Sequence, residues 1–488
     1  MSYIQGEDRN QTILFPESIE EYIGKDNPVR IINEYIDQLD LEALHFCRAT
    51  DQKRGRPPYH PADLLKLYLY GYLNHIRSSR RLEAETGRNL EVIWLMRKLR
   101  PDFKTIADFR KDNKKALVKV FRNFTQLCNS WQLFGKELLA IDGSKFRACN
   151  SKRNNYSQKK LARHINYLNE KITSYLQQLD EYDQLESQDR RPDAQEVKEK
   201  IAQLRERKER YQGYQKKLRE TNQNQISTTD PDSRLMANHN NQVEVSYNVQ
   251  STVDARHKLI VDFKVTDKPN DQGQLAPMAL RARKILGKPV FTILADKGYY
   301  HAGDLEHCTR KGMTLYVTKQ SYSNRTGDKD FYPDRFIYNP AKDSYLCPAG
   351  HTLFYYRTRK KEGKILGDDY RNSPACQSCP LKPRCTRAKK GRTIFRHRSQ
   401  DFLDYIDEQT QKNLPTYRLR QMIVEHPFGT IKRAWGASYF LTRRQVSVSA
   451  EIALSFLAYN LKRVINILVP FCFVKEQKRE DDFHSLPY

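Results

Sequence analysis

The sequence lacks any long hydrophobic run. Its longest apolar stretch, residues 467–474, is short and contains Pro470, so we do not expect it to span a bilayer. The first residues also lack the basic start followed by an apolar segment that is typical of a secretory signal. From these two absences we expect an intracellular protein without a membrane span.

Acidic residues are scarce relative to basic ones. The chain has 59 Asp and Glu against 85 Lys and Arg, which gives a formal net charge of +26 and an isoelectric point near 9.5. A chain of this kind either has a solvated basic surface or binds a polyanion through counterion release. Because the basic residues recur along the whole length, we favour nucleic acid as the partner. The length of 488 residues predicts two or three domains.

Structural disulfides are not expected, because an intracellular compartment keeps thiols reduced. Five of the nine cysteines are scattered and are interpreted as small buried residues: Cys47, Cys128, Cys149, Cys308 and Cys472. The other four form the pattern of one cysteine, a gap and C-x-x-C-x5-C: Cys347, Cys376, Cys379 and Cys385. Closely spaced thiolates suit tetrahedral structural zinc. His351 could replace one sulfur, and an iron–sulfur cluster or four unligated thiols are the alternatives.

The first part of the chain is predicted to be helical. Residues 60–73 repeat apolar side chains at helical spacing, and residues 105–110 open a later helix. Arginines lie between these segments, and Arg80 and Arg81 are candidate DNA-binding residues. Two interpretations fit residues 1–130: a helix-turn-helix DNA-binding domain, and a structural helical bundle with a basic rim.

Strand patterns alternate with helix patterns further along, which predicts a mixed α/β sheet. A turn over residues 254–257 is expected to join two of the strands as a hairpin. The expected strands are residues 137–146, 243–250, 259–265, a run that ends at Asp296, and 314–318, and the expected helices are residues 273–286 and 302–311.

Residues 151–225 interrupt the strand pattern. Apolar residues recur there in steps of four and three along two segments, with a breaker at residues 189–193. This spacing predicts a helical hairpin of the coiled-coil type, which would act as a structural arm or as an interaction or dimerisation surface. The predicted seam contains Leu161, Ile165, Leu168, Ile172, Tyr175, Leu179 and Tyr182 on one segment and Val197, Ile201, Leu204, Lys208, Tyr211, Gln215 and Leu218 on the other.

Three carboxylates stand at widely separated positions. Asp142 and Asp296 end apolar strand-like runs, and Glu425 lies on a helix predicted over residues 417–433. Any one of them could be a strand-end cap or a salt-bridge partner. Together they predict a site for two Mg²⁺ or Mn²⁺ ions, since such hard cations prefer oxygen ligands and phosphates. Two ions can activate a water or a 3′-hydroxyl and stabilise the leaving oxygen in phosphodiester cleavage and transfer.

Other residues near these acids have two interpretations each. Gly143 and Gly298 are expected to leave room for a nucleic-acid backbone beside the aspartates. Asp230 and Asp232 could position DNA or cap a turn, and Trp435 could stack on an unpaired base or pack in the core.

The chain resembles the insertion-sequence transposases that carry an aspartate-aspartate-glutamate (DDE) triad on a ribonuclease-H-like fold. The resemblance covers residues 20–465, nearly the whole chain. It rests on residues 140–144, 294–299 and 417–432, on the closing segment 451–463, and on residues 59–65 with 105–110 for the N-terminal helical domain.

The resemblance implies that the protein binds the terminal inverted repeats of its own mobile element, cuts there and joins the 3′ ends to target DNA. Asp142, Asp296 and Glu425 would hold two Mg²⁺ or Mn²⁺ ions. Relatives carry a similar four-cysteine insert before the glutamate helix. The double-stranded DNA partner, a homodimer in the active complex and a cytoplasmic, nucleoid-associated location in a bacterial-type cell are expectations of the same kind.

Relatives also carry a tyrosine, an arginine and a lysine around the glutamate. Lys432 matches the lysine, seven positions after the glutamate. Gln421 stands where the arginine is usual, so Arg420 and Arg418 are the nearest substitutes, and Tyr417 lies one position early. On charge grounds the two arginines and the lysine suit phosphate contact.

The expected organisation is α/β: a ribonuclease-H-like mixed sheet core with a helical N-terminal domain, a coiled-coil hairpin insert and a Cys-rich insert. Three rival hypotheses are a zinc-containing DNA-binding regulator without catalysis, an RNA-directed nuclease on the same fold, and a coiled-coil scaffold. The predicted parts are residues 1–130 (helical, DNA-binding), 131–320 (first part of the core, with the hairpin at 151–225), 321–410 (strand-rich four-cysteine insert), 411–470 (glutamate helix and a C-terminal helix over 446–469) and 471–488 (tail).

Overall fold

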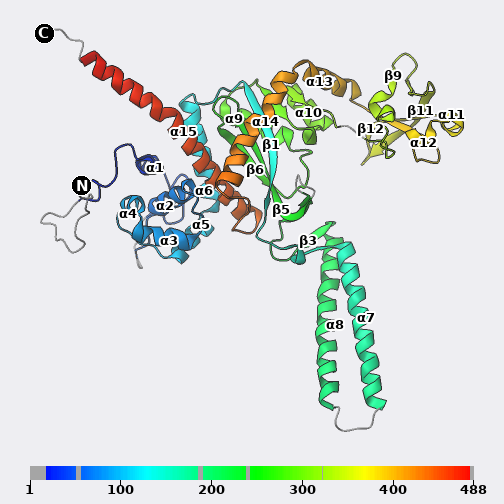
Figure 1. Ribbon diagram of the computed structural model, residues 1–488, viewed down its shortest axis with the longest axis horizontal. Helices are drawn as coiled ribbons and strands as arrows, with labels where there is room; N and C mark the ends of the chain where they lie inside the picture. Colours follow the sequence, from blue (N-terminus) through cyan, green and yellow to red (C-terminus); the bar gives the residue numbers. More distant parts are fainter. Residues whose placement is uncertain (1–17, 51–56, 185–190, 238–241, 321–322, 484–488) are drawn as a thin grey trace, which may run out of the picture.

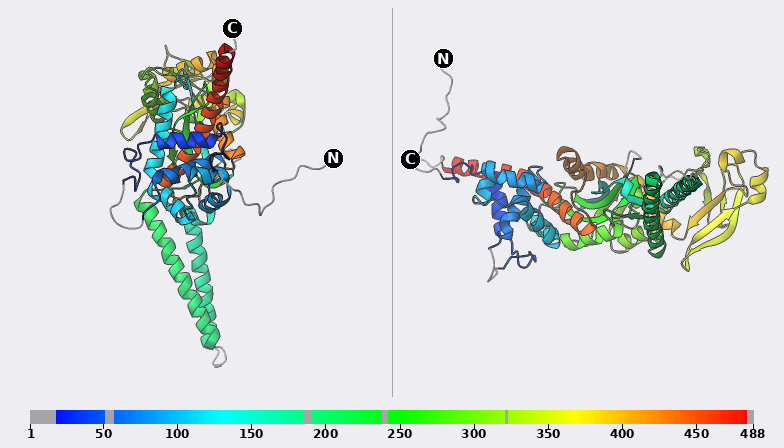
Figure 2. Two further views of the ribbon diagram at one scale, coloured as in Figure 1. Left: turned by 90° about the vertical axis from the view of Figure 1, so that its left-hand side faces the viewer. Right: turned by 90° about the horizontal axis from the view of Figure 1, so that it is seen from below.

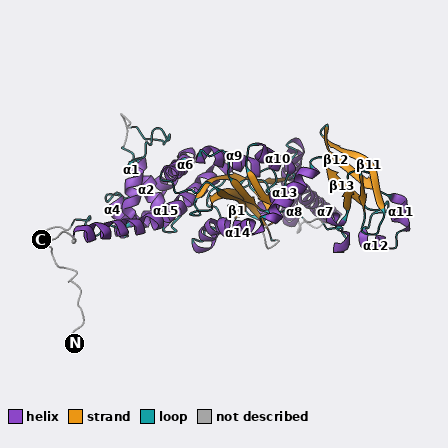
Figure 3. Cartoon of the chain, turned by 90° about the horizontal axis from the view of Figure 1, so that it is seen from above, coloured by secondary structure: helices purple, strands orange, loops and turns teal. Residues whose placement is uncertain are grey.

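The computed structural model describes residues 18–50, 57–184, 191–237, 242–320 and 323–483. A central body of helices and sheet carries two projections, a long helical hairpin and a strand-rich insert (Figure 1). Seen from above, the N-terminal helices lie at one end of the body and the insert lies at the other (Figure 3).

Six strands form the sheet of the body. Strand β5 is antiparallel to β1 on one side and to β6 on the other, whereas β7 is parallel to β1 and β8 is parallel to β7. The resulting order is β6, β5, β1, β7, β8, and the short β4 pairs with the start of β5. The predicted mixed α/β class and all five predicted strands are confirmed. The bounds are β1 Leu138–Arg147, β4 Arg234–Ala237, β5 Val243–Asp254, β6 Ile260–Thr266, β7 Thr292–Ala295 and β8 Thr314–Val317.

Two helices cross between the strands as predicted. The helix α9 (Leu275–Leu286) connects β6 to β7, and α10 (Ala302–Arg310) connects β7 to β8. Parallel neighbours need such crossovers, because a tight turn can join only antiparallel strands. Helix α9 stops at Gly287, whose φ of +66° suits a residue without a side chain.

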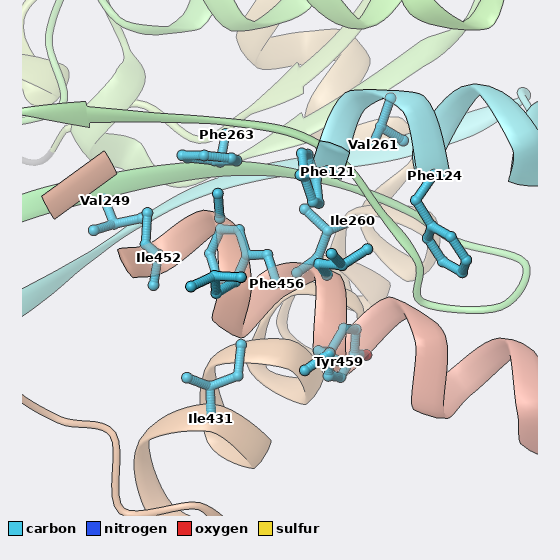
Figure 4. Packing of buried hydrophobic residues seen from close by; sticks show 14 of the residues in the cluster. Phe121, Phe124, Val249, Ile260, Val261, Phe263, Ile431, Ile452, Phe456 and Tyr459 are labelled. Atoms are coloured by element: carbon cyan, nitrogen blue, oxygen red, sulfur yellow. The ribbon is translucent and has the colours of Figure 1, made fainter. Parts of the chain in front are cut away.

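The N-terminal helices share one hydrophobic core with the sheet. Phe121 of α6 packs edge-on against Phe263 of β6, with ring centroids 5.1 Å apart, and Phe456 of α15 contacts the same ring at 5.3 Å (Figure 4). Aromatic pairs of this kind contribute about 1 kcal/mol each beyond the area they bury. The helices are α1 Pro28–Asp37, α2 Pro61–Leu73, α3 Ser79–Arg88, α4 Leu90–Leu95, α5 Phe103–Asp112, α6 Lys114–Ser130 and α15 Gln445–Phe483.

The last helix, α15, is longer than the sequence pattern predicts. The apolar face suggests residues 446–469, whereas the helix continues through Pro470 to Phe483. Residues 450–461 of α15 are buried and connect α6, α2 and β6. None of the described helices combines the length and the hydropathy that crossing a bilayer requires.

Helices α7 (Gln158–Gln184) and α8 (Arg191–Glu220) run side by side away from the body, as Figures 1 and 2 show. The two-stranded sheet of β2 (Asn155–Ser157) and β3 (Gln225–Ser227) joins their bases. The predicted seam positions Leu161, Leu168, Tyr211 and Leu218 are buried together there. Part of the predicted breaker over residues 189–193 lies outside the described residues.

The insert is a separate five-stranded antiparallel sheet in the order β13, β12, β11, β10, β9. It has its own small core of Phe336, Tyr345, Leu353, Tyr370 and Ile394. Helices α13 and α14 then return the chain to the body (Figure 1). The bounds are β9 Ile337–Asn339, β10 Ser344–Leu346, β11 Thr352–Lys361, β12 Lys364–Arg371, α11 Ser373–Ser378, α12 Lys382–Cys385, β13 Thr393–His397, α13 Gln400–Lys412 and α14 Leu414–Gly429.

Candidate active site

The parallel pairing of β1 with β7 brings Asp142 and Asp296 together. The pairing ends with Ile141 opposite Ala295, so the two aspartates follow at the same level on neighbouring strands. Asp296 comes directly after β7, whereas β1 continues to Arg147 along β5. Asp142 therefore lies in the middle of its strand, at the point where β7 departs, and not at the strand end that the sequence suggests.

Arg420 of α14 lies between the two aspartates. Its guanidinium nitrogens are 3.6 Å from Oδ2 of Asp142 and 3.8 Å from Oδ1 of Asp296. The side chains of Arg420, Asp142 and Asp296 are 18%, 25% and 43% exposed, so the contact is shielded but open on one side. One positive group thus bridges two carboxylates where a divalent cation would be expected.

The carboxyl of Asp142 is costly to ionise. Burial raises its pKa to about 7, and the charges of Asp271 and Asp296 act in the same direction, against the lowering effect of Arg420 and of the Gly143 amide. A carboxyl with a pKa near neutrality gains strongly from a bound cation, because an opposite charge favours the ionised form. This perturbation marks Asp142 as a functional candidate.

Asp271, which the sequence interpretation missed, is the fourth acid of this region. It accepts hydrogen bonds from the amides of Asn248 (2.8 Å) and Gln250 (2.7 Å), both buried on β5. Gln250 in turn accepts a hydrogen bond from the hydroxyl of buried Tyr299. The signal in the sequence was weak: Asp271 stands in a polar link between β6 and α9 without any periodic pattern.

The predicted room beside the glycines is filled by Asp271. A Cβ on Gly143 would lie 2.6 Å from Oδ1 of Asp271 and 2.8 Å from Oδ1 of Asn248, and a Cβ on Gly298 would lie 3.3 Å from Oδ2 of Asp271. The expectation that these glycines leave space for a nucleic-acid backbone is therefore wrong. The two glycines leave space for the carboxylate of Asp271, which the side-chain amides of Asn248 and Gln250 hold in place.

Glu425 lies on the same helix as Arg420 but on another face. Five residues of α-helix turn by about 140° beyond a full circle, so Arg420 and Glu425 cannot face the aspartates together. Glu425 is exposed and accepts a hydrogen bond of 2.9 Å from Gln421. Within the described part of the chain, no group of three or more His, Cys, Asp or Glu side chains is arranged to hold a metal ion.

Lys432 contacts β1 two and three residues after Asp142. Its ammonium donates to Oγ of Ser144 and to the carbonyl of Lys145, both at 2.6 Å, and lies 4.3 Å from the ring centroid of Phe146. Burial lowers its pKa to about 8, although Asp142 acts in the opposite direction. A π-helical turn over Thr430–Ala434 follows α14 and carries Lys432 to β1.

The remaining predicted DNA-binding residues are spread over two surfaces. The hydroxyls of Tyr417 and Thr318 share a hydrogen bond of 2.9 Å at the end of β8, while Arg418 is exposed on α14. Arg80 and Arg81 are exposed on α3, where the Arg80 guanidinium lies over the ring of Phe103 at 4.9 Å.

Two other candidates have structural contacts. Asp230 is buried and accepts hydrogen bonds from the Tyr247 hydroxyl and the Arg444 amide, and Asp232 accepts one from the Gln445 amide at the start of α15. In the segments that the structure describes, these carboxylates thus bond to the start of α15 and not to the turn that contains them. Trp435 packs beside His75, with ring centroids 5.3 Å apart.

The four clustered cysteines line one small cavity of about 20 Å³ in the insert. Burial raises the pKa of Cys385 to about 11, and the nearby thiols of Cys376, Cys347 and Cys379 contribute in the same direction. A cavity of this size holds about one water molecule or one ion. Among the described residues, these four thiols are not arranged closely enough to hold a metal ion, and the same is true of the acids of the site.

Two protein-family models match the chain. Residues 17–112 match the model described as "Transposase domain (DUF772)", and residues 346–465 match the "Transposase DDE domain". Both matches identify transposase domains and support an insertion-sequence DDE transposase. No curated protein and no solved structure matches it. The second match includes the four clustered cysteines, Glu425 and Lys432, whereas Asp142 and Asp296 lie outside both matched segments.

The family supports a role in DNA transposition and implies a nuclease or transposition activity. DDE transposases generally use divalent metals such as Mg²⁺, and they act on DNA. The N-terminal match covers α1 to α5 and agrees with the resemblance on which the helical domain was recognised.

Proposed function

We propose that this transposase binds the ends of its own mobile element and catalyses metal-dependent cleavage and strand transfer there. Asp142, Asp296 and Glu425 are the proposed ligands of two Mg²⁺ or Mn²⁺ ions. The double-stranded DNA partner comprises the terminal inverted repeats and the target. We also propose a homodimer as the active form and a cytoplasmic, nucleoid-associated location.

The observation that carries this proposal is the bridge of Arg420 between Asp142 and Asp296. A cationic group already balances these two carboxylates, and the oxygen donors fit a hard divalent cation. Bound at this place, Mg²⁺ ions would activate the attacking oxygen and stabilise the leaving one. The chain's own residues hold the two carboxylates at one level of adjacent strands.

The strand order supports a ribonuclease-H-like core. Three antiparallel strands (β6, β5, β1) continue into two parallel ones (β7, β8), with helices at the crossovers. Asp142 on the central strand β1 and Asp296 after β7 occupy the middle of this sheet. Ligands of open α/β sheets bind at the carboxyl ends of strands, and Asp296 lies at the carboxyl end of β7.

Glu425 completes the proposed triad from α14. That helix packs on β1, β5 and β7, and it already delivers Arg420 to the aspartates. Participation of Glu425 requires that Arg420 leave the two carboxylates, which frees its guanidinium for a DNA phosphate. Arg418, Tyr417 and Lys432 are the proposed neighbours of the same DNA strand, with Arg80 and Arg81 on a second DNA-binding surface.

We also propose structural zinc at Cys347, Cys376, Cys379 and Cys385. The shared cavity supports this proposal, because four thiols that face one ion-sized space match the donor set of a closed zinc site. The long α7–α8 pair, with its buried apolar seam at the base, supports a coiled-coil arm.

The test is cleavage of a plasmid that carries the inverted repeats flanking the gene. We expect nicking at the repeats with Mg²⁺ or Mn²⁺ and none with a chelator. Asp142→Asn, Asp296→Asn and Glu425→Gln should each abolish nicking while gel-shift binding to the repeats remains. The matched controls Asp180→Asn and Glu170→Gln, both exposed on α7, should cleave normally. Full cleavage by all three triad variants would refute the proposal.

A further inference from the structure

Strand β11 exposes three consecutive aromatic rings. Phe354, Tyr355 and Tyr356 are 56%, 53% and 48% exposed. A strand on the edge of a core normally buries every second side chain, because successive side chains point to opposite faces. Here only Leu353 enters the small core of the insert, and the three rings that follow stay about half exposed. Tyr355 lies beside Tyr370, with ring centroids 6.5 Å apart, on the face opposite to Phe354. Contiguous exposed apolar surface of this kind is typical of a binding site.

A β-bulge directs one of these rings. Tyr355 pairs with Tyr370 and Arg357 pairs with Asp369, so Tyr356 is an extra residue that has no partner position on β12. Bulges re-aim side chains and are common beside functional sites. The guanidinium of Arg371 lies 3.7 Å from the ring centroid of Tyr356 and supports it from one side. The ring is therefore held in a defined orientation and keeps about half of its surface free.

The hairpin that carries the rings is basic on its surface. Residues 352–371 contain six basic and three acidic side chains. One of the acids, Asp369, is fully buried, and Arg357 and Arg359 neutralise it at 2.9 and 2.6 Å. Lys360, Lys361 and Lys364 at the turn are exposed. An approaching polyanion thus meets cations and aromatic faces together.

We propose that Phe354 and Tyr356, with Arg371 beneath Tyr356, form a stacking platform for unpaired nucleobases of DNA on one face of the hairpin. Aromatic rings with adjacent cations are the means by which proteins hold single strands without sequence preference. Paired bases cannot offer their faces, because neighbouring pairs already stack on them. This inference rests on the proposed function and specifies a second DNA contact of the transposase, for strands opened beside the cut.

The position of the insert fits this role. A cleft of about 830 Å³ separates it from the body, with Gln272, Gln320 and Phe336 in its wall. Gln272 follows Asp271 in the chain, and Gln320 donates a hydrogen bond of 3.0 Å to the carbonyl of Lys297, next to Asp296. The cleft therefore opens from the neighbourhood of the aspartates towards the insert that bears the platform.

The test is equilibrium binding by fluorescence anisotropy in a chelator, with the full chain carrying Asp142→Asn, so that no cleavage is measured. The probes are a labelled 20-nucleotide oligothymidylate and a 20-base-pair duplex. The double variant Phe354→Ala/Tyr356→Ala should lose about tenfold or more in affinity for the single strand. Its affinity for the duplex should change less than twofold. The exposed tyrosines Tyr167 and Tyr405 provide matched controls, since Tyr167→Ala/Tyr405→Ala should alter neither.

Two further experiments separate phosphate contacts from base contacts and provide a test that does not depend on the folding of the variant. Lys360→Ala/Lys361→Ala should weaken both probes and reduce the salt dependence, because these cations contact phosphate and not bases. Should the aromatic variant unfold, photocrosslinking of a 5-bromouracil oligonucleotide to the chain with its aromatic residues intact should label Phe354 or Tyr356. Equal loss for single strand and duplex, or crosslinks only elsewhere, would overturn the platform. Binding of a protein to these rings would also overturn the platform if the variant kept its affinity for the single strand. The anisotropy assay measures binding and not cleavage. A failure of the proposed catalytic function would therefore not change its result, so the two failures can be told apart.

Discussion

Arg420 and Asp142 are in ionic contact across the helix–sheet interface, with 3.6 Å between the guanidinium and the carboxylate. The same guanidinium reaches Asp296 at 3.8 Å. A helix and two strands that are far apart in sequence thus form one charge cluster. In this arrangement a side-chain cation competes with any metal ion for the two carboxylates.

The first prediction concerns this competition. Arg420→Ala should bind Mg²⁺ about three- to tenfold more tightly than the unmodified chain, since a cation within 4 Å of both carboxylates is removed. Isothermal titration calorimetry measures this at pH 8.5, which is above the pKa of about 7 of Asp142 in the unmodified chain. Arg418→Ala, an exposed change on the same helix, is the control and should leave the affinity unchanged. Weaker Mg²⁺ binding by Arg420→Ala would contradict the competition.

The second prediction concerns the space beside Gly143. Gly143→Ala should destabilise the fold by about 1–3 kcal/mol, because the new methyl group must displace Asp271 or the β5 amides from a packed site. Urea unfolding measures the change. Gly213→Ala in α8 has no atom within 4 Å of the new Cβ, so it should be neutral or stabilising by up to about 1 kcal/mol. Equal stability of the two variants would show that Asp271 does not occupy this space.

Much of the sheet could be predicted from the sequence, because its strands are continuous apolar runs and the crossover helices have clear periodicity. The position of Asp296 directly after its strand followed from the same runs, whereas Asp142 was expected at the end of an apolar run and lies within β1. The contact of Arg420 did not, since it depends on the rotation of α14 about its axis. The π-helical turn after α14 likewise changes the rotational phase of the residues that follow it, such as Lys432, and local patterns do not reveal it.

Asp271 was missed for a related reason. Its role arises from hydrogen bonds to Asn248 and Gln250, which lie on a strand that contacts it only after folding. The length of α15 beyond residue 469 also could not be predicted, because Pro470 normally indicates a helix end. Side-chain contacts between segments that are far apart in the sequence are thus the part of the site that sequence patterns did not predict.

The third prediction concerns the four cysteines. The purified chain should contain about one zinc per protein, whereas Cys376→Ser/Cys379→Ser should contain none, because two of four thiolate ligands are lost. Elemental analysis by mass spectrometry measures the stoichiometry. Cys47→Ser, at an exposed thiol outside the insert, is the control and should retain the metal. Absence of zinc from the unmodified protein, prepared without chelators, would exclude the proposed site.

The fourth prediction uses the raised pKa of Asp142, about 7 against an ordinary value of 3.8. Because the folded state binds the proton more strongly, ionisation costs stability increasingly from pH 4 to pH 7, and the cost is constant above that. Asn at this position cannot ionise. In a chelator, the unfolding free energy of Asp142→Asn minus that of the unmodified chain should therefore rise by about 2 kcal/mol from pH 5 to pH 8. Denaturant unfolding at both pH values measures it, with Asp180→Asn as the control. A difference that does not vary with pH would contradict the burial of this carboxyl.

The most direct measurement of the proposed site is anomalous diffraction from crystals of the transposase soaked in Mn²⁺. We predict Mn²⁺ bound by the carboxylates of Asp142 and Asp296, with Arg420 displaced and Glu425 turned towards the ion. Mn²⁺ bound only elsewhere, or an Arg420 bridge that persists at saturating Mn²⁺, would contradict the assignment of these residues as the catalytic metal site.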